Sequence, residues 1–262
     1  MDAGLLSGII IAAATVLAAI IAKEWGKKEK PQTPSVSAPR KLARSNKIGS
    51  HEAAYAFVSI RHVLKKGVAL DKIISDLIAI DYQTIRNIEE RDVGSLTRWR
   101  PIVEANLDCW GLVTTGQRNI VGYWHFNALR ERFFKKALQG SLHDGELTLD
   151  AIEILVKPGH YHLYVFIVAV VIEHRGCVVN RLLLEGFCRK LIEFAALGIF
   201  FDEIVANAYT DEGLALCNHL GMDYVCDHKD HGKIYRIVMN PLPDCFALVP
   251  ELRNYYLKVR QS

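Results

Sequence analysis

The sequence has few of the features that mark nucleic-acid-binding or disulfide-stabilised proteins. Its net charge is only +3 over 262 residues, which gives no electrostatic case for a nucleic-acid partner. The six cysteines form no CxxC pair and no regular framework, so we expect reduced thiols in a cytosolic compartment. The segment from Cys226 to His231 contains metal-ligand residue types, but no second ligand pair accompanies it. We therefore interpret this segment as a hairpin loop and expect no metal site.

Charge is also absent from a long run near the N-terminus. Ala3–Ala22 carries no charged residue and is long enough to cross the roughly 30 Å hydrocarbon core as a helix. Asp2 precedes the run and lysines follow it from Lys23 onward, the reverse of the order in a signal peptide. A buried soluble helix is the other alternative, but an all-apolar helix would need a larger core. The sequence therefore predicts that residues 1–24 form a transmembrane helix in the lipid bilayer.

The charge order around this run predicts an orientation. The lysines on its C-terminal side place the rest of the chain in the cytoplasm under the positive-inside rule. We expect a single-pass protein of the cytoplasmic (inner) membrane. Residues 25–50, rich in proline, serine and basic residues, predict a flexible linker because they offer nothing to bury.

Periodicity divides the remainder into a helical preface at 51–81 and a main domain at 82–262. His51–Lys66 and Leu70–Ile80 show helical spacing of apolar residues. The elements expected in the main domain are a strand at 84–88, short helices at 92–105, a hairpin at 109–127, a helix at 129–139, a strand at 147–156, a strand at 200–208, a helix at 211–220, a hairpin at 222–239 and a terminal helix at 246–259. This order predicts an α/β fold with a mixed sheet.

The stretch Tyr164–Gly198 organises this domain. Tyr164–Ile172 is a continuous apolar run, typical of a strand buried on both faces. The period then changes to three and four, which indicates an amphipathic helix with Asn180 as a plausible cap and Gly198 at its end. A buried strand that enters a helix through a short turn directs backbone N–H groups and the helix dipole at one spot. That spot favours an anion, especially a phosphate.

These residues resemble the GNAT acetyltransferase superfamily, whose acetyl-CoA loop follows V-x-P-x-x-R-G-x-G-x-G/A-x-x-L-L. The chain reads VVIEHRGCVVNRLLL at 170–184, so Arg175, Gly176 and the leucines match. Val178 and Asn180 stand at the two later glycine positions. Downstream, TDEGLALCNHLGM at 210–222 is similar to the family's N-x-x-A-x-x-L-Y-x-K-x-G-F, with Cys217 where the family usually has tyrosine. The resemblance covers roughly Tyr82 to Asn240 and implies a GNAT fold.

The resemblance also implies a site for acetyl-CoA or a related acyl-CoA cosubstrate. The expected ligand loop is Arg175, Gly176, Cys177, Val178, Val179, Asn180 and Arg181. The stiff Val178 crowds this loop, although it is backbone N–H groups that bind the anion. The alternative is a structural strand–helix junction with a relaxed loop.

Acyl transfer needs a base for the amine and an acid for the departing thiolate. Glu173, at the mouth of the long strand, is a candidate base; the alternative is a solvated strand-end carboxylate. Cys217 is a candidate acid, and the alternative is a small core residue of an amphipathic helix. Tyr209, which follows the next strand, is a candidate replacement for the missing tyrosine.

The leading hypothesis is a membrane-anchored bacterial N-acyltransferase that moves an acetyl or acyl group from CoA to an unidentified amine or protein acceptor. Two alternatives use the same cleft without turnover. One is a catalytically degenerate GNAT-fold module for binding or interaction, and the other is a membrane-anchored sensor of a nucleotide-like ligand. The glycine-poor loop is the feature that distinguishes the enzyme from the module. Tight binding of acetyl-CoA would favour the enzyme, and no binding would favour the module.

Overall fold

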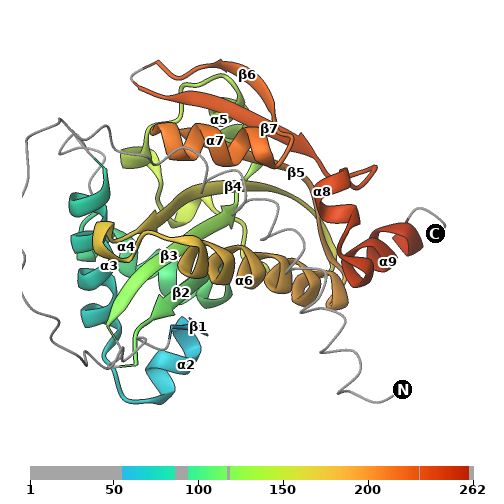
Figure 1. The fold of residues 1–262 in the computed structure, drawn as a ribbon. Helices are drawn as coiled ribbons and strands as arrows, with labels where there is room; N and C mark the ends of the chain where they lie inside the picture. The colour runs from blue at the N-terminus through green and yellow to red at the C-terminus, as the bar shows by residue number, and fades with distance from the viewer. Residues whose placement is uncertain (1–54, 86–93, 117–118, 230, 260–262) are drawn as a thin grey trace, which may run out of the picture.

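The computed structural model describes residues 55–85, 94–116, 119–229 and 231–259 (Figure 1). The predicted transmembrane helix at 1–24 and the linker at 25–50 lie outside the described residues. Within the described ranges, no helix has the length and apolar character needed to cross a membrane.

A seven-stranded mixed sheet forms the centre of the molecule, in the order β1-β2-β3-β4-β5-β7-β6 (Figure 1). The strands are β1 Ala56–Ser59, β2 Trp110–Thr114, β3 Ile120–Ala128, β4 Gly159–Val170, β5 Ile199–Ala208, β6 Asp223–Asp227 and β7 Lys233–Val238. Neighbours are antiparallel except β4 and β5, which are parallel and connected through a helix. The predicted α/β mixed sheet is confirmed.

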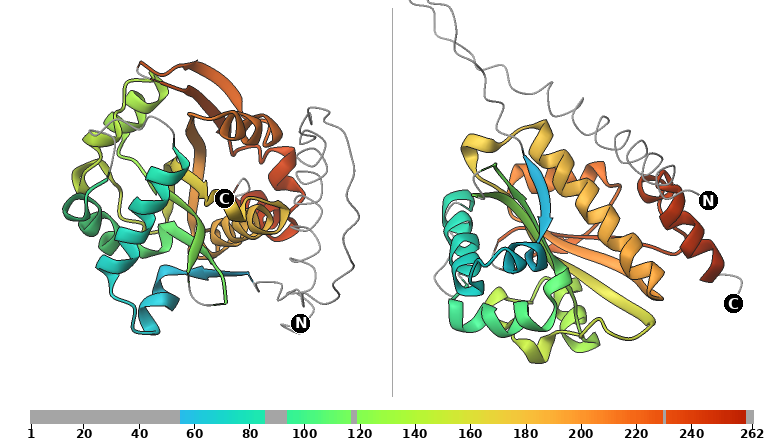
Figure 2. Two further views of the ribbon diagram at one scale, coloured as in Figure 1. Left: turned by 60° about the vertical axis from the view of Figure 1, so that its left-hand side comes forward. Right: turned by 90° about the horizontal axis from the view of Figure 1, so that it is seen from below.

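Helices cover both faces of the sheet (Figure 2). The α-helices are α2 Ile60–Lys65, α3 Leu70–Thr84, α4 Leu96–Ala105, α5 Glu131–Leu138, α6 Cys177–Ala196, α7 Asp211–His219, α8 Asp244–Ala247 and α9 Pro250–Val259, and the short 3-10 helices are η1 Leu107–Cys109, η2 Asp144–Glu146, η3 Leu149–Ala151 and η4 Ile172–His174. Side chains of β3 contact helices on both faces of the sheet. Trp124 donates its indole N–H to Leu183 O of α6 at 3.1 Å, whereas its neighbour Tyr123 bonds Asp81 of α3.

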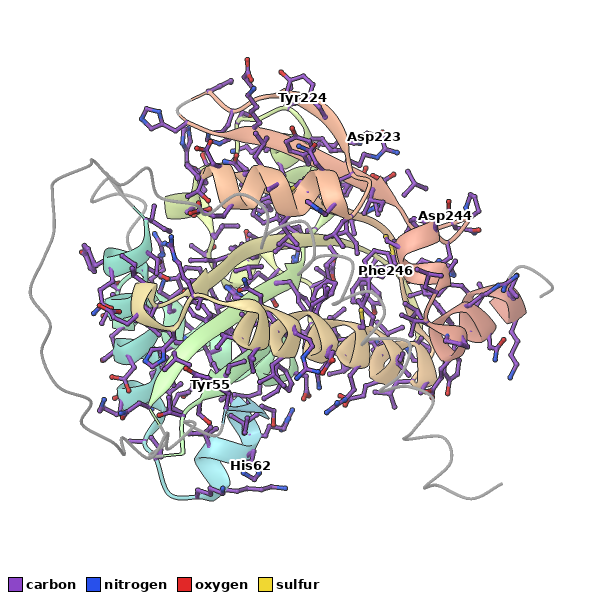
Figure 3. The ribbon with its side chains drawn as sticks, in the orientation of Figure 1. Tyr55, His62, Asp223, Tyr224, Asp244 and Phe246 are labelled. Atoms are coloured by element: carbon purple, nitrogen blue, oxygen red, sulfur yellow. The ribbon has the colours of Figure 1, made fainter. Side chains whose placement is uncertain are left out.

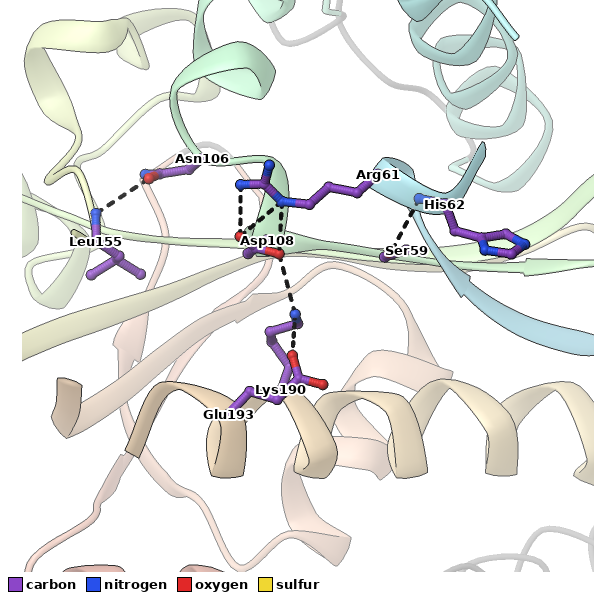
Figure 4. Close-up of polar contacts among 8 residues, drawn as sticks. All are labelled: Ser59, Arg61, His62, Asn106, Asp108, Leu155, Lys190 and Glu193. Atoms are coloured by element: carbon purple, nitrogen blue, oxygen red, sulfur yellow. Dashed lines mark hydrogen bonds and ion pairs between the residues drawn. The ribbon is translucent and has the colours of Figure 1, made fainter. Parts of the chain in front are cut away.

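A chain of ion pairs joins elements that are distant in sequence (Figure 4). Arg61 of α2 meets Asp108 of η1 at 2.9 Å, and Lys190 of α6 meets the same carboxylate at 3.4 Å. Lys190 also pairs with Glu193 and is only 9% exposed. The network therefore joins α2 to α6, the helix that packs across the sheet.

The C-terminal helices close one end of the sheet. Phe246 of α8 is buried in the main core (Figure 3), and the hydroxyl of Tyr256 in α9 donates to the backbone oxygen of Phe201 at 3.0 Å. The single terminal helix expected from the sequence is two helices because Pro250 begins the second one.

Several predicted elements differ from the structure. Ala56–Ser59, expected within a helix, is edge strand β1, because its backbone pairs with β2 and Phe57 stacks on Trp124. Ile60 and Ile73 belong to the same core as the later strands, and the boundary expected near Tyr82 falls inside α3. Thr84, expected to open a strand, closes that helix.

Two further differences lie around β4 and α6. Residues 147–156, expected as a strand, hold η3 and a single bridge from Leu129 to Ile152. Helix α6 is capped by Gly176 and not by Asn180, so it begins at Cys177. β4 is not buried on both faces along its whole length, since Val168 is 45% exposed.

Candidate functional site

The sheet opens between β4 and β5. Their parallel pairing runs from Gly159 with Ile199 to Val165 with Ala206, and there it stops. β4 continues to Val170, still paired on its other edge with β3. The stretch Phe166–Val170 therefore presents one backbone edge that β5 no longer covers. An extended ligand can pair with such an edge.

The start of α6 lies directly after this free edge. Gly176 is the N-cap, with extended backbone angles and no side-chain cap bond. The first backbone N–H groups of a helix have no partner within the helix, and the helix dipole adds positive character there. A Cβ built on Gly176 would meet nothing within 4 Å. The position therefore combines open space with exposed donors.

The other residues of the predicted ligand loop divide between surface and core. Val178 is 42% exposed, whereas Val179 is buried in the main core. Cys177 is the first residue of α6; its side chain is not described. Asn180 is half-buried, and Arg181 is exposed with Glu185 at 4.0 Å. The valine at the glycine position thus faces outward and leaves the first turn accessible.

Arg175 spans the mouth of the opening. Its guanidinium bonds Glu212, at the start of α7, at 3.1 Å, and its Nε donates to Val170 O at 3.3 Å. Both partners of the ion pair are largely exposed. A ligand phosphate at the start of α6 would have to compete with Glu212 for this guanidinium.

The three predicted catalytic residues occupy different surroundings. Glu173 lies in η4 and is exposed. Cys217 is buried in the main core, and burial raises the pKa of its thiol to about 11. Tyr209 follows β5 and lines a cavity beside the opening. Tyr209 is the one of the three that reaches this cavity.

The cavity encloses about 60 Å³ between α3, α4 and the sheet. One wall is aliphatic, from Ile74, Leu77 and Ile78 of α3, and the other is made of rings, including Trp99 and Phe166. Ile167, on the free edge of β4, also lines it, so the cavity lies beside the opening between β4 and β5. A mostly apolar lining with a few polar groups is usual in ligand sites.

Asp81 of α3 is the acidic group in this apolar wall. The pKa of its carboxyl is raised to about 7: burial raises it most, the hydrogen bond from Tyr123 lowers it, and the negative charge of Asp144 adds to the rise. Burial also holds the pKa of the Tyr123 hydroxyl well above its ordinary value. A carboxyl that titrates near neutrality accepts and releases a proton under working conditions.

A chain of amides fixes the protonation of His125. Leu155 N–H donates to Asn106 Oδ1 at 3.3 Å, so the amide nitrogen of Asn106 donates to Asn127 Oδ1 at 2.8 Å and to Glu153 O at 2.9 Å. The amide nitrogen of Asn127 then donates to His125 Nε2 at 2.7 Å. Burial lowers the pKa of His125 well below its ordinary value. The neutral ring therefore carries its proton on Nδ1.

An unpaired N–H donor lies next to this ring. Trp110 stacks on His125 with ring centroids 3.5 Å apart. The buried Nε1–H of Trp110 has no hydrogen-bond partner among the described residues. Both rings line the cavity. An unpaired buried donor is costly unless a ligand or water supplies the acceptor.

Sequence reasoning missed Asp81, Tyr123, His125 and Trp110. Two local signals point to them. Asp81 stands four residues after Leu77, on the apolar face of its helix, where a carboxylate is out of place. Strand alternation puts Tyr123 and His125 on one face of β3. Neither signal shows that the two faces meet around a cavity.

Comparison with known proteins gives structural likenesses only. No family model matches the chain, and no curated protein matches it. A solved protein from Pyrococcus horikoshii is 14% identical, with 71% of this chain and 98% of that chain covered and a TM-score of 0.44. An acetyltransferase from Thermus thermophilus is 14% identical, with 70% and 96% covered and a TM-score of 0.41.

A further likeness is to a GNAT-superfamily phosphinothricin acetyltransferase from Sinorhizobium meliloti, solved in complex with AcCoA. It is 12% identical, with 70% of this chain and 85% of that chain covered and a TM-score of 0.41. These identities and TM-scores are low, so the likenesses carry no argument about what the chain does.

Proposed function

We propose that the chain transfers an acyl group from an acyl-CoA to an amine. The observation that supports this proposal is the opening between β4 and β5. The start of α6 lies at its mouth, and the cavity lined by Asp81 lies beside it. The free edge Phe166–Val170 suits an extended thioester arm, and the first N–H groups of α6 suit its phosphates. Acetyl-CoA is the cosubstrate expected from the sequence resemblance.

Asp81 is the proposed base and Tyr209 the proposed acid. The amine loses its proton to the Asp81 carboxylate, its nitrogen attacks the acyl carbonyl, and the thiolate leaves with a proton from Tyr209. Both side chains line the same cavity. Glu173 is not among the residues that line the cavity, and Cys217 is buried in the core, where its raised pKa keeps the thiol protonated.

The test is release of free CoA thiol from acetyl-CoA with a panel of primary amines. Asp81→Asn should lower kcat by about 10²–10⁴ if Asp81 is the base, while CoA affinity changes little. Glu173→Gln is the matched control, because it removes the other candidate carboxylate outside the cavity. Thiol release that falls with Glu173→Gln and not with Asp81→Asn would reverse the assignment.

The second candidate is a GNAT-fold module that binds a ligand without turnover. One observation favours it: the Arg175–Glu212 ion pair lies across the mouth, where Glu212 competes with a ligand phosphate. Binding of acetyl-CoA with no thiol release for any amine in the panel would make this candidate the better one.

The proposal includes a membrane anchor and its orientation. The uncharged run Ala3–Ala22, with lysines after it, supports a single-pass anchor in a cytoplasmic membrane that leaves the catalytic domain in the cytoplasm.

A further inference from the structure

A residue far away in sequence contacts the loop proposed for the cosubstrate. The hydroxyl of Tyr55 (Figure 3) and Nδ1 of His174 share a hydrogen bond of 3.0 Å across 119 positions of sequence. Their rings also meet edge to face, with centroids 5.8 Å apart. Tyr55 directly precedes β1, and His174 is the last residue of η4. Arg175 and Gly176 follow, and α6 begins after them. The contact therefore reaches the turn that leads into α6.

His174 is the half-buried residue of this turn. Within 172–176 the other four residues are exposed. The backbone N–H groups of His174 and Arg175 bond oxygens three residues earlier in the chain, at 2.9 and 3.2 Å. Such local bonds give the turn its shape, but its attachment to the rest of the molecule depends on side chains. The contact with Tyr55 is an attachment of this kind.

Tyr55 is a well-fixed partner for this contact. Its side chain packs against the main core, and Ala56–Ser59, which follows it, pairs with β2. Phe57 in the same strand stacks on Trp124 of β3. Because β1 is joined to its neighbours through both backbone and ring contacts, the bond to Tyr55 ties the loop to the edge of the sheet.

We propose that Tyr55 and His174 are positioning residues for the cosubstrate. Their contact holds η4 in place, so that Arg175 and the first N–H groups of α6 keep one arrangement for the ligand phosphates. This inference rests on the proposed function, since it takes this loop as the phosphate site. Groups that are fixed before the ligand arrives lose less freedom on binding, and this raises affinity.

Arg175 is less suited to holding the loop. Its guanidinium bonds Val170 O and pairs with Glu212, and a phosphate at the start of α6 would have to compete for it. The bond between Tyr55 and His174 uses no group that is assigned to the ligand. It can therefore stay in place when the site fills.

A double-mutant cycle with CoA as the probe tests the contact. Tyr55→Phe keeps the ring and removes the hydroxyl, and His174→Leu removes the ring nitrogens. Each should weaken CoA binding to the full-length chain about three- to tenfold by calorimetry, the range of one neutral hydrogen bond. The double variant should bind no more weakly than the weaker single variant, because both changes remove the same contact. His174→Asn keeps a polar atom near the place of Nδ1 and should bind more tightly than His174→Leu.

Tyr161→Phe is the matched control. Tyr161 is also half-buried against the main core, and its hydroxyl bonds Lys157 O at 2.9 Å near the start of β4, whereas the loop follows the end of that strand. Hydrogen exchange in the ligand-free chain gives a second measurement. The bonded N–H groups of His174 and Arg175 should exchange about three- to tenfold faster in Tyr55→Phe and at the unchanged rate in Tyr161→Phe.

The outcomes separate this inference from the proposed function, because thiol release from acetyl-CoA is measured on the same variants. Coupled losses of CoA affinity without thiol release support the inference and count against the transferase. Thiol release in a chain whose CoA affinity is unchanged by Tyr55→Phe keeps the transferase and overturns the inference.

Four further results would overturn the inference: additive losses in the double variant, an equal loss in Tyr161→Phe, a loss in His174→Asn as large as in His174→Leu, or hydrogen exchange that Tyr55→Phe leaves unchanged. An unchanged chain that does not bind CoA would overturn both the inference and the proposed function.

Discussion

Asp81 places an ionisable carboxyl among apolar side chains. The stability of the fold therefore depends on whether this carboxyl is protonated. Its carboxyl has a pKa of about 7 in the folded chain, whereas an unfolded aspartate titrates near pH 4. Between these values the folded state keeps a proton that the unfolded state has lost. The free energy of unfolding should therefore fall as pH rises from about 4 to 7 and level off above 7.

Asp81→Asn should remove this dependence. The amide preserves the shape and an acceptor for Tyr123, and it cannot ionise. We expect the variant to be more stable at pH 8 by on the order of 2–4 kcal/mol and little changed at pH 4. Urea unfolding at the two pH values measures the difference. Asp76→Asn is the control on the same helix, since Asp76 forms an exposed pair with Lys72. A gain in the free energy of unfolding of equal size at both pH values would contradict the raised pKa of Asp81.

Arg175 offers a second test at a single residue. If its guanidinium turns from Glu212 to a phosphate, Glu212→Gln removes the competitor and Arg175→Ala removes the contact. We expect Glu212→Gln to tighten CoA binding by up to about fivefold, because exposed ion pairs are worth roughly 0.2–1 kcal/mol. Arg175→Ala should weaken binding by about 1–3 kcal/mol.

Calorimetry with CoA measures both effects. Glu193→Gln is the control, because Glu193 pairs with Lys190 near the other end of α6. If the Arg175 and Glu212 variants bind CoA as the unchanged chain does, the phosphates lie elsewhere.

At the scale of elements, the sequence predicts the helices and strands whose apolar residues recur with a clear helical or strand period. β4, α6, α7 and the two hairpins follow from apolar runs, alternation and turn residues. β1 could not be recognised, because Ala56–Ser59 is a strand only through its pairing with β2. Residues 147–156 look like a strand, but Asn106 bonds the backbone at Glu153 and Leu155 in place of a neighbouring strand. Tertiary contacts decide such segments.

The ion-pair network of α2, η1 and α6 gives an element-scale prediction. Although burial by itself raises the pKa of Asp108, the hydrogen bonds and charges of Arg61 and Lys190 together lower it. A lowered carboxyl pKa contributes stability that is present above the unfolded value near 4 and is lost as pH falls through the folded value. Asp108→Asn should therefore destabilise the chain at pH 7 by about 1 kcal/mol, because the site is partly solvated.

The same variant should matter less at pH 3 than at pH 7, because the stability from a lowered carboxyl pKa is lost progressively below the unfolded value near 4. Thermal unfolding at the two pH values measures this, and Asp71→Asn, whose pair with Arg100 is exposed, serves as the control. A loss that is as large at pH 3 as at pH 7 would show that Asp108 acts through packing and not through its charge.

At the scale of the whole molecule, the candidate site is assembled from both halves of the chain. The loop at Arg175 and Gly176 was found from a contiguous motif. The cavity was not, because Tyr123 and Asp81 meet across 42 residues and two layers. Patterns of three to five residues cannot show that a carboxylate on one helix faces a tyrosine on a strand. The sequence therefore pointed to the loop proposed for the cosubstrate and did not reveal the cavity proposed for the acceptor.

The anchor is the remaining prediction at this scale. Every described element begins at Tyr55 or later, so a chain that starts at His51 keeps them all. We expect the full-length chain to stay with membranes through salt and carbonate washes and the shortened chain to be released. Ile11→Lys with Val16→Lys should also release it, because each lysine within the span costs about 2.5–3.5 kcal/mol.

Ile11→Ala with Val16→Ala is the control for those substitutions and should remain in the membrane. Orientation is tested with protease added to spheroplasts. A cytoplasmic domain is protected until the membrane is opened, since the lysines after Ala22 stay inside. Digestion in intact spheroplasts would reverse the topology, and it would remove the domain from the compartment where acyl-CoA would have to reach the opening between β4 and β5.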